Sequence, residues 1–98
     1  MSQTRKTLER IKRRIISTQN SLAENRAMQD IYGQSIVAAM QDGGEEGAMR
    51  ARLLTLKRKV LEAQDVEMTR LLTVADQTVT TLQRRVNAEN DADKPGAS

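Results

Sequence analysis

The segment Asp42-Gly43-Gly44-Glu45-Glu46-Gly47 places three glycines in six residues between two long helical patterns. Each glycine costs about 1 kcal/mol relative to alanine inside a helix, so we expect the chain to turn here. Gly43 or Gly44 can adopt the left-handed conformation that ends a helix. The acidic residues that follow suit the positive end of a new helix dipole. The sequence therefore predicts a Gly-rich turn over residues 42–47.

Helical patterns occupy the chain on both sides of this turn. Aliphatic residues, Ala, Gln and Arg dominate, and the single proline is Pro95. No useful length of the chain shows the apolar–polar alternation of a strand. We predict helices over residues 4–41 and 46–87, which make residues 1–87 one all-α domain, an αα-hairpin of two long antiparallel helices. Residues 88–98 lack apolar periodicity, and we expect them to be a disordered polar tail.

Apolar residues repeat along both helical patterns at the spacing of a coiled coil. In the first pattern, four-three spacing runs from Leu8 to Ala39 through a polar middle. The second pattern begins at Met49 and changes to four-four-three spacing after Val60, so we expect its supercoil to relax there. The residues predicted to form the seam and to bind a partner are Leu8, Ile11, Ile15, Leu22, Tyr32, Ile36, Leu53, Leu56, Val60, Met68, Leu71, Val79 and Leu82.

The centre of the predicted seam is polar. A hairpin that turns at residues 43–46 places Asn25 and Gln29 opposite Gln64, and it brings Arg26 level with Asp65. Polar groups at a helix interface fix the register at some cost in stability. We expect this centre to keep self-association weak enough for another helix to displace it.

Apolar residues beside the seam indicate association. Two helices enclose no interior, so about nine further apolar side chains, each worth roughly 1.5–3 kcal/mol when fully buried, would remain in water in a lone hairpin. These residues are Ile16, Met28, Ile31, Val37, Met40, Leu54, Leu61, Leu72 and Val74. We expect a helical protein partner that completes a four-helix bundle or a coiled coil. The pattern leaves open whether that partner is a second copy or another protein.

Basic residues gather in two places although the net charge is only +3. Residues 50–59 hold five basic residues and no acid. The other cluster, which the hairpin brings together at its open end, consists of Arg5, Lys6, Arg10, Arg13, Arg14, Arg84 and Arg85. Such clusters suit phosphates, anionic lipid or an acidic protein segment, and they also occur as solvated faces. The alternative function is therefore an RNA- or DNA-binding hairpin dimer that acts as a regulator.

Several classes of function conflict with the composition. The chain has no His and no Cys, and no nucleophile lies beside a plausible base, so we expect no enzyme, no cofactor and no metal site. The turn lacks the Lys and Ser/Thr of a phosphate-binding loop. The longest wholly apolar run, residues 36–40, is far shorter than the roughly 20 residues that cross a bilayer. Basic N-terminal residues without an apolar core after them do not form a secretory signal, so we expect a cytoplasmic protein.

The N-terminal residues Ser2-Gln3-Thr4-Arg5, followed by Leu8, Lys12 and Ile15, are similar to the start of small helical-hairpin chaperones of bacterial type III secretion systems. The chain also resembles this family in its length, its basic character and its lack of Cys. The resemblance implies a chaperone that keeps an aggregation-prone helical export substrate in solution by supplying helices to a coiled coil. It transfers no functional residue. From the residues alone we predict a non-enzymatic coiled-coil module that binds protein.

Overall fold

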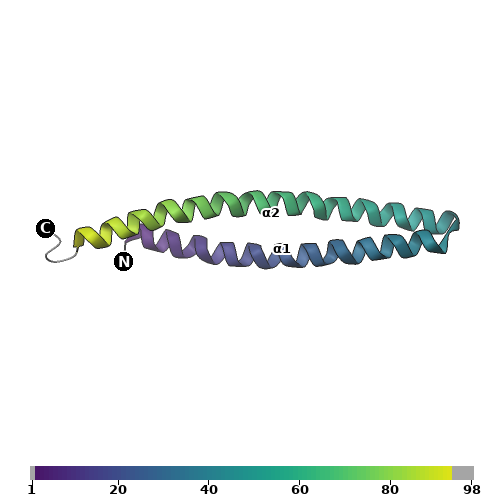
Figure 1. Cartoon of the computed structure of the whole chain (residues 1–98), viewed down its shortest axis with the longest axis horizontal. Helices are drawn as coiled ribbons and strands as arrows, with labels where there is room; N and C mark the ends of the chain where they lie inside the picture. The colour runs from purple at the N-terminus through teal and green to yellow at the C-terminus, as the bar shows by residue number, and fades with distance from the viewer. Residues whose placement is uncertain (1, 94–98) are drawn as a thin grey trace. The chain divides into compact units, whose positions relative to one another are not determined.

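The computed structural model describes residues 2–93, and all of its regular structure is α-helical. The helix α1 spans Gln3–Asp42 and the helix α2 spans Gly44–Asp93 (Figure 1). The two helices form the predicted antiparallel hairpin, and no strand occurs within residues 2–93. The start of α1 follows from its cap, because the Ser2 hydroxyl accepts a hydrogen bond from the Arg5 backbone N–H at 3.2 Å.

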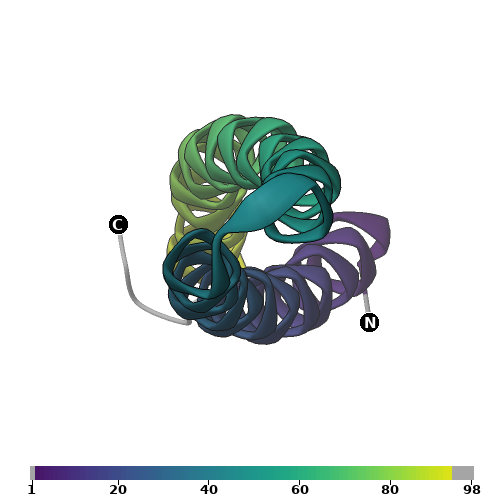
Figure 2. The ribbon, with the colours of Figure 1, turned by 90° about the vertical axis from the view of Figure 1, so that its right-hand side faces the viewer.

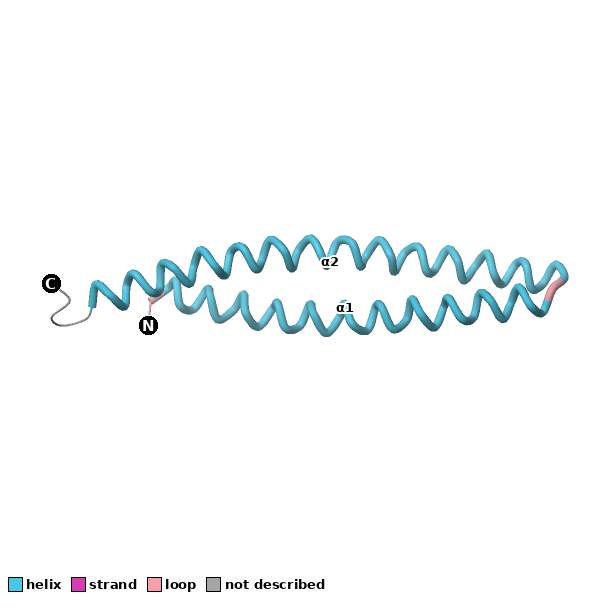
Figure 3. The backbone as a smooth tube through the Cα atoms, viewed as in Figure 1, coloured by secondary structure: helices cyan, strands magenta, loops and turns pink. Residues whose placement is uncertain are grey.

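The turn is much shorter than the predicted segment 42–47. Within the segment 42–47, only Gly43 lies outside both helices, and Figure 3 shows the break between the helices as a short loop. Gly43 and Gly44 have φ values of 69° and 70°, and the Gly43 N–H donates to the carbonyl oxygen of Met40 at 3.2 Å. The chain crosses from α1 to α2 at this point (Figure 2). Residues 45–47 already belong to the first turn of α2, where Glu45 and Glu46 suit the helix dipole.

Gly47 allows the two helices to approach each other next to the turn. A Cβ atom on Gly47 would lie 2.5 Å from the carbonyl oxygen of Ala39. Real Cβ atoms do not come so close to a carbonyl, so no other residue fits here without a backbone shift. Gly47 is buried and Ala39 is 5% exposed, which shows how closely the helices meet.

The second helix continues beyond its predicted end near residue 87. It reaches Asp93, and the helical residues 88–93 correct the prediction that they are disordered. Contacts with the start of α1 account for the extension, because Arg5 Nη2 donates to Asn90 Oδ1 and Val86 is 6% exposed. Sequence periodicity does not report such tertiary contacts. The rest of the predicted tail, residues 94–98, lies outside the described residues.

The chain divides into two compact units. The unit that we call the terminal unit contains Met1–Gln19 and Arg70–Ser98, and its described part buries Leu8 and Val86. The unit that we call the turn unit contains Asn20–Thr69, and it buries Leu22, Asn25 and Ala39. In each unit, a segment of α1 pairs with an antiparallel segment of α2.

The helices meet along a heptad seam in both units. On α1, every position of the predicted four-three spacing from Leu8 to Ala39 is buried or partly buried; these positions are Leu8, Ile11, Ile15, Thr18, Leu22, Asn25, Gln29, Tyr32, Ile36 and Ala39. On α2, the same spacing continues without a shift through Gly47, Ala51, Leu54, Arg58, Leu61, Asp65, Met68, Leu72, Ala75, Val79, Leu82, Val86 and Glu89. The predicted relaxation toward four-four-three spacing is therefore wrong.

Four residues predicted for the seam of α2 lie outside it. Leu53, Leu56, Val60 and Leu71 are 55%, 60%, 59% and 54% exposed. Leu54, Leu61 and Leu72, which were predicted to lie beside the seam, are partly buried in it. The prediction followed the larger aliphatic residues, whereas the true seam of α2 also accepts small and charged residues.

Candidate helix-binding surface

A polar layer interrupts the apolar seam of the turn unit. Asn25 is only 7% exposed, and its Nδ2 donates to the carbonyl oxygen of Leu61 at 3.0 Å. Gln29 Nε2 donates to Asn25 Oδ1 at 2.6 Å and to Asp65 Oδ2 at 2.9 Å. The partner of Gln29 on α2 is thus Asp65 and not Gln64, which is exposed, so that part of the prediction is wrong. Because buried polar groups need partners, this layer favours one register of the two helices.

Asp65 also anchors an ion pair across the helices. Arg26 Nε lies 3.1 Å from Asp65 Oδ2, and Arg26 Nη2 donates to Asp65 Oδ1 at 3.4 Å. The hydrogen bond from Arg26 lowers the pKa of Asp65, the hydrogen bond from Gln29 lowers it further, and partial burial opposes both. The hydrogen bond to Asp65 and its charge raise the pKa of Arg26. This ion pair confirms the prediction that Arg26 and Asp65 lie at the same level of the hairpin.

Arg58 occupies a seam position opposite Gly33. A Cβ atom on Gly33 would lie 3.5 Å from both Cζ and Nη1 of Arg58, so the guanidinium fills the space beside the glycine. Arg58 Nε is 3.5 Å from Glu62 Oε1, close enough for an ion pair. The same Nε is buried and has no hydrogen-bond partner, because the pair lacks the required geometry. One of the five basic residues in segment 50–59 therefore points into the helix pair.

A second apolar stripe runs along α2 in the turn unit. Met49, Leu53, Leu56 and Val60 follow four-three-four spacing, and they are 66%, 55%, 60% and 59% exposed. If the seam residues of α2 take heptad positions a and d, these four residues take positions f and c. Those positions lie on the side of the helix opposite the seam. We call these four residues the outer stripe.

Basic residues line both edges of the outer stripe. Arg50, Arg52, Lys57 and Lys59 are exposed, and each lies next to a stripe residue in the heptad. Arg50 Nη2 is 3.0 Å from Asp42 Oδ2, and both side chains are more than half exposed. The other three form no ion pair with a residue of the described chain. No acidic residue occurs between residues 47 and 61.

The exposed apolar residues of α1 are distributed differently. In the turn unit they occupy several heptad positions on both sides of the seam, and they are Met28, Ile31, Val37 and Met40. In the terminal unit, Ile16 of α1 is exposed, as are Leu71 and Val74 of α2. The prediction that apolar residues remain outside the seam is therefore confirmed for six residues, namely Ile16, Met28, Ile31, Val37, Met40 and Val74.

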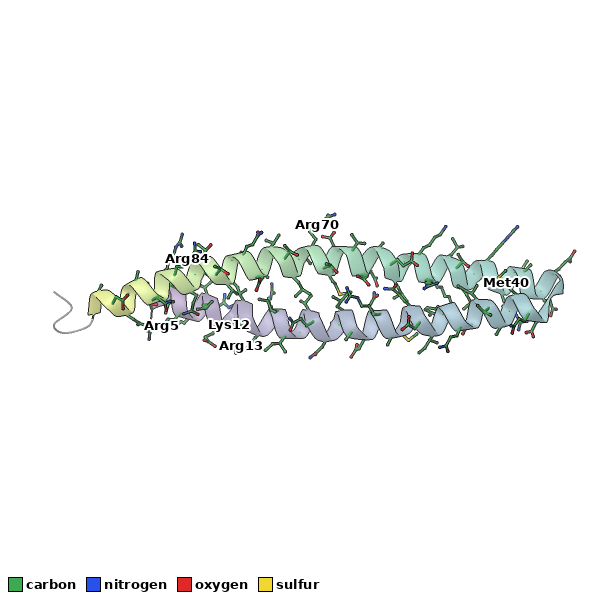
Figure 4. The ribbon with its side chains drawn as sticks, viewed as in Figure 1. Arg5, Lys12, Arg13, Met40, Arg70 and Arg84 are labelled. Carbon is green, nitrogen blue, oxygen red and sulfur yellow. The ribbon has the colours of Figure 1, made fainter. Side chains whose placement is uncertain are left out.

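The basic cluster of the terminal unit is exposed along its whole length. All seven predicted members are exposed, and none forms an ion pair with another residue in the described part of the chain. Lys12 Nζ donates to Gln83 Oε1 at 3.5 Å, which places Arg84 and Arg85 beside the basic residues of α1. Figure 4 labels Arg5, Lys12, Arg13 and Arg84 in this unit. Arg13 Nε also donates to the Glu9 backbone carbonyl at 3.4 Å.

The described residues contain neither a cluster of metal ligands nor a membrane-spanning helix. Residues 2–93 contain no group of three acidic side chains placed to hold a metal ion. Neither helix, over its described length, has a stretch long and apolar enough to cross a membrane. Comparisons of the chain with models of protein families, with curated proteins and with solved structures found no match.

Proposed function

We propose that the protein is a non-enzymatic module that binds other helical proteins by coiled-coil pairing. The observation that carries this proposal is the apolar surface of the turn unit. Nine large apolar side chains of that unit are at least 39% exposed; they are Met28, Ile31, Val37, Met40, Met49, Leu53, Leu56, Val60 and Val66. Covering their exposed parts would contribute on the order of 10 kcal/mol, which is comparable to the net stability of a domain.

Within this class, the proposal is a small cytoplasmic chaperone or adaptor that sequesters a helical, secreted client. Three features support it: the resemblance of the N-terminal residues to type III secretion chaperones, the exposed apolar surface and the polar layer of the seam. Asn25, Gln29 and Asp65 satisfy one another only in one pairing of helices. Such a layer reduces the strength of non-specific self-association and leaves surfaces available for a client.

The first test measures the mass of the full chain by light scattering and sedimentation velocity. The chain is measured alone from about 1 to about 100 μM, and also after co-expression with the products of neighbouring genes. We expect self-association or a stable complex with a helical partner. A compact monomer that melts cooperatively across this range, and that copurifies with none of those products, would contradict the proposal.

The second candidate function is binding of RNA or DNA by the terminal unit. Seven exposed basic residues without ion pairs in the described chain favour it. Contacts with about six phosphates would weaken binding about a thousandfold between about 50 and about 200 mM salt. An affinity for a duplex or single-stranded oligonucleotide that does not change over this range would exclude this candidate.

A further inference from the structure

We propose that the outer stripe of α2 binds an acidic amphipathic helix of another protein. The stripe consists of Met49, Leu53, Leu56 and Val60, and its edges are Arg50, Arg52, Lys57 and Lys59. This inference rests on the proposed function, and it specifies the chemistry of the partner. The bound helix lies against the side of α2 that faces away from α1 in the turn unit.

The spacing of the stripe determines the type of partner. Met49, Leu53, Leu56 and Val60 repeat at four and three residues, which is the spacing that a second helix needs to insert side chains between them. A strand would meet every second residue of its partner and would not match this spacing. Ala63 continues the pattern by three residues, so the stripe offers about two heptads to a partner.

The charges at the edges of the outer stripe determine the sign of the charge that the partner helix carries. In a coiled coil, the residues beside the apolar stripe face the corresponding residues of the other helix, and their charges select the partner. All four edge residues of the outer stripe are basic and exposed. Arg52, Lys57 and Lys59 have no ion pair within the described residues, and the Arg50 pair with Asp42 is itself exposed. A helix with Glu or Asp at its edge positions therefore complements both rows.

The same charges disfavour a second copy on this stripe. Two copies that pair through their outer stripes place Lys and Arg against Lys and Arg in both the parallel and the antiparallel arrangement. Nucleic acid fits less well than a helix, because phosphates would pair with the two basic rows and leave the apolar row between them in water. No aromatic residue is present in the stripe to stack on a base.

The test uses the full chain and a synthetic four-heptad peptide with Leu and Ile at positions a and d and Glu at positions e and g. Two control peptides have the same length: one carries Lys in place of Glu, and the other carries Ser in place of Leu and Ile. Binding is measured by fluorescence anisotropy at about 50 and about 500 mM NaCl. We expect the Glu peptide to bind at least about tenfold more tightly than the Lys peptide, with an affinity that falls as salt increases. The Ser peptide is expected not to bind.

Two triple variants locate the peptide. Leu53→Gln with Leu56→Gln and Val60→Gln removes the outer stripe, and Ile16→Gln with Leu71→Gln and Val74→Gln changes similarly exposed residues of the terminal unit. We expect the first variant to bind the Glu peptide at least about 30-fold more weakly and the second to bind within about threefold of the wild type. Thermal melting followed by circular dichroism checks that both variants fold.

A charge reversal supplies an independent test. Lys57→Glu with Lys59→Glu leaves two basic and two acidic edge residues and is expected to abolish the preference for the Glu peptide, and Lys6→Glu with Arg10→Glu in the terminal unit is expected to leave that preference unchanged. Four results would overturn the inference. The first is equal binding of the Glu and Lys peptides, and the second is Glu-peptide binding that the stripe variant leaves intact. The third is self-association through the stripe, and the fourth is tighter binding of an oligonucleotide than of the Glu peptide at the stripe. In the first three cases a helix still binds and the proposed function stands. If no helical peptide binds and the chain remains a monomer in the mass measurements, the proposed function fails as well.

Discussion

At the scale of single residues, the glycines of this chain have different structural roles. Gly43 and Gly44 have positive φ values and allow the helix reversal. Gly47 lies against the backbone of Ala39, whereas Gly33 lies only against the side chain of Arg58. Only the positive φ of Gly43 or Gly44 was foreseen from the sequence.

The contrast between Gly33 and Gly47 leads to opposite predictions for alanine. Gly33→Ala introduces a methyl group at ordinary contact distance from Arg58, so it is expected to raise the free energy of unfolding by about 0.5–1 kcal/mol through helix propensity. Gly47→Ala forces the backbone of Ala39 to move and is expected to lower that free energy by about 1–3 kcal/mol. Urea titration followed by circular dichroism measures both. A stabilised Gly47→Ala variant would show that the close approach is absent.

The ion pair of Arg26 and Asp65 predicts a dependence of stability on pH. Its surroundings lower the pKa of Asp65 below the ordinary value of 3.8. The stabilisation is therefore fully present above that value and is lost as the pH falls through the lower pKa of the folded state. We expect the Tm of the wild type to fall more steeply between about pH 5 and about pH 2 than the Tm of Asp65→Asn.

The matched control for this prediction is Asp30→Asn. Asp30 is an exposed carboxylate on α1 that has no ion pair within the described residues. Melting curves of the three proteins are compared at equal ionic strength. If Asp65→Asn follows the same pH profile as the wild type, Asp65 is not the titrating group.

At the scale of the elements, α1 and α2 differ in how clearly their sequences identify the seam. On α1 the large aliphatic residues Leu8, Ile15 and Leu22 lie in the seam, so apolar periodicity identified it correctly. On α2 two heptad patterns occupy opposite sides, and the outer one carries larger aliphatic residues over residues 49–60. Over the same residues, the seam itself contains Ala51 and Arg58. Ranking by hydrophobicity therefore selects the outer pattern as the seam. The hydrogen bonds of Asp65 and the space beside Gly33, which Arg58 fills, instead favour the pattern that faces α1.

The candidate surface could also be predicted only in part, because the sequence does not show how the helices pair. Sequence reasoning found the excess of apolar residues and both basic clusters, because exposure of charge and an incomplete interior follow from composition and spacing. It could not separate Arg58 from its basic neighbours, since only the helix pairing shows that Arg58 faces Gly33. The outer stripe was present in the predicted seam as Leu53, Leu56 and Val60, but it was placed on the wrong side of α2.

Adjacent leucines on α2 test which pattern is the seam. Leu54 is partly buried, and Leu54→Ala is expected to lower the free energy of unfolding by roughly 1–3 kcal/mol. Leu53 is 55% exposed, and Leu53→Ala is expected to change it by less than about 0.5 kcal/mol at low protein concentration. Chemical denaturation at a concentration below any self-association compares them. Equal losses for the two variants would mean that the seam is not where the structure places it.

At the scale of the whole molecule, the polar layer and the exposed apolar surface act on association in opposite directions. The apolar surface favours contact with other helices, and the polar layer limits which helices pair well. Removing the layer with Asn25→Leu and Gln29→Leu is therefore expected to increase self-association and to allow more than one pairing. Sedimentation velocity would show larger or mixed assemblies, whereas the wild type would give a narrower distribution. A single species of unchanged mass with a lower Tm would indicate that the layer contributes to stability and not to specificity.

Tyr32 is the sole aromatic residue of the chain, and it lies partly buried in the seam of the turn unit. Its ultraviolet absorption and emission therefore come from one known location, without interference from any other ring. A tryptophan-free and tyrosine-free ligand that rests on the far side of α2 should leave this signal almost unchanged, whereas one that separates the two helices should alter it strongly. The protein thus contains an intrinsic optical reporter. It distinguishes a ligand that docks on the outside of α2 from a ligand that displaces one helix of the pair, without any added label.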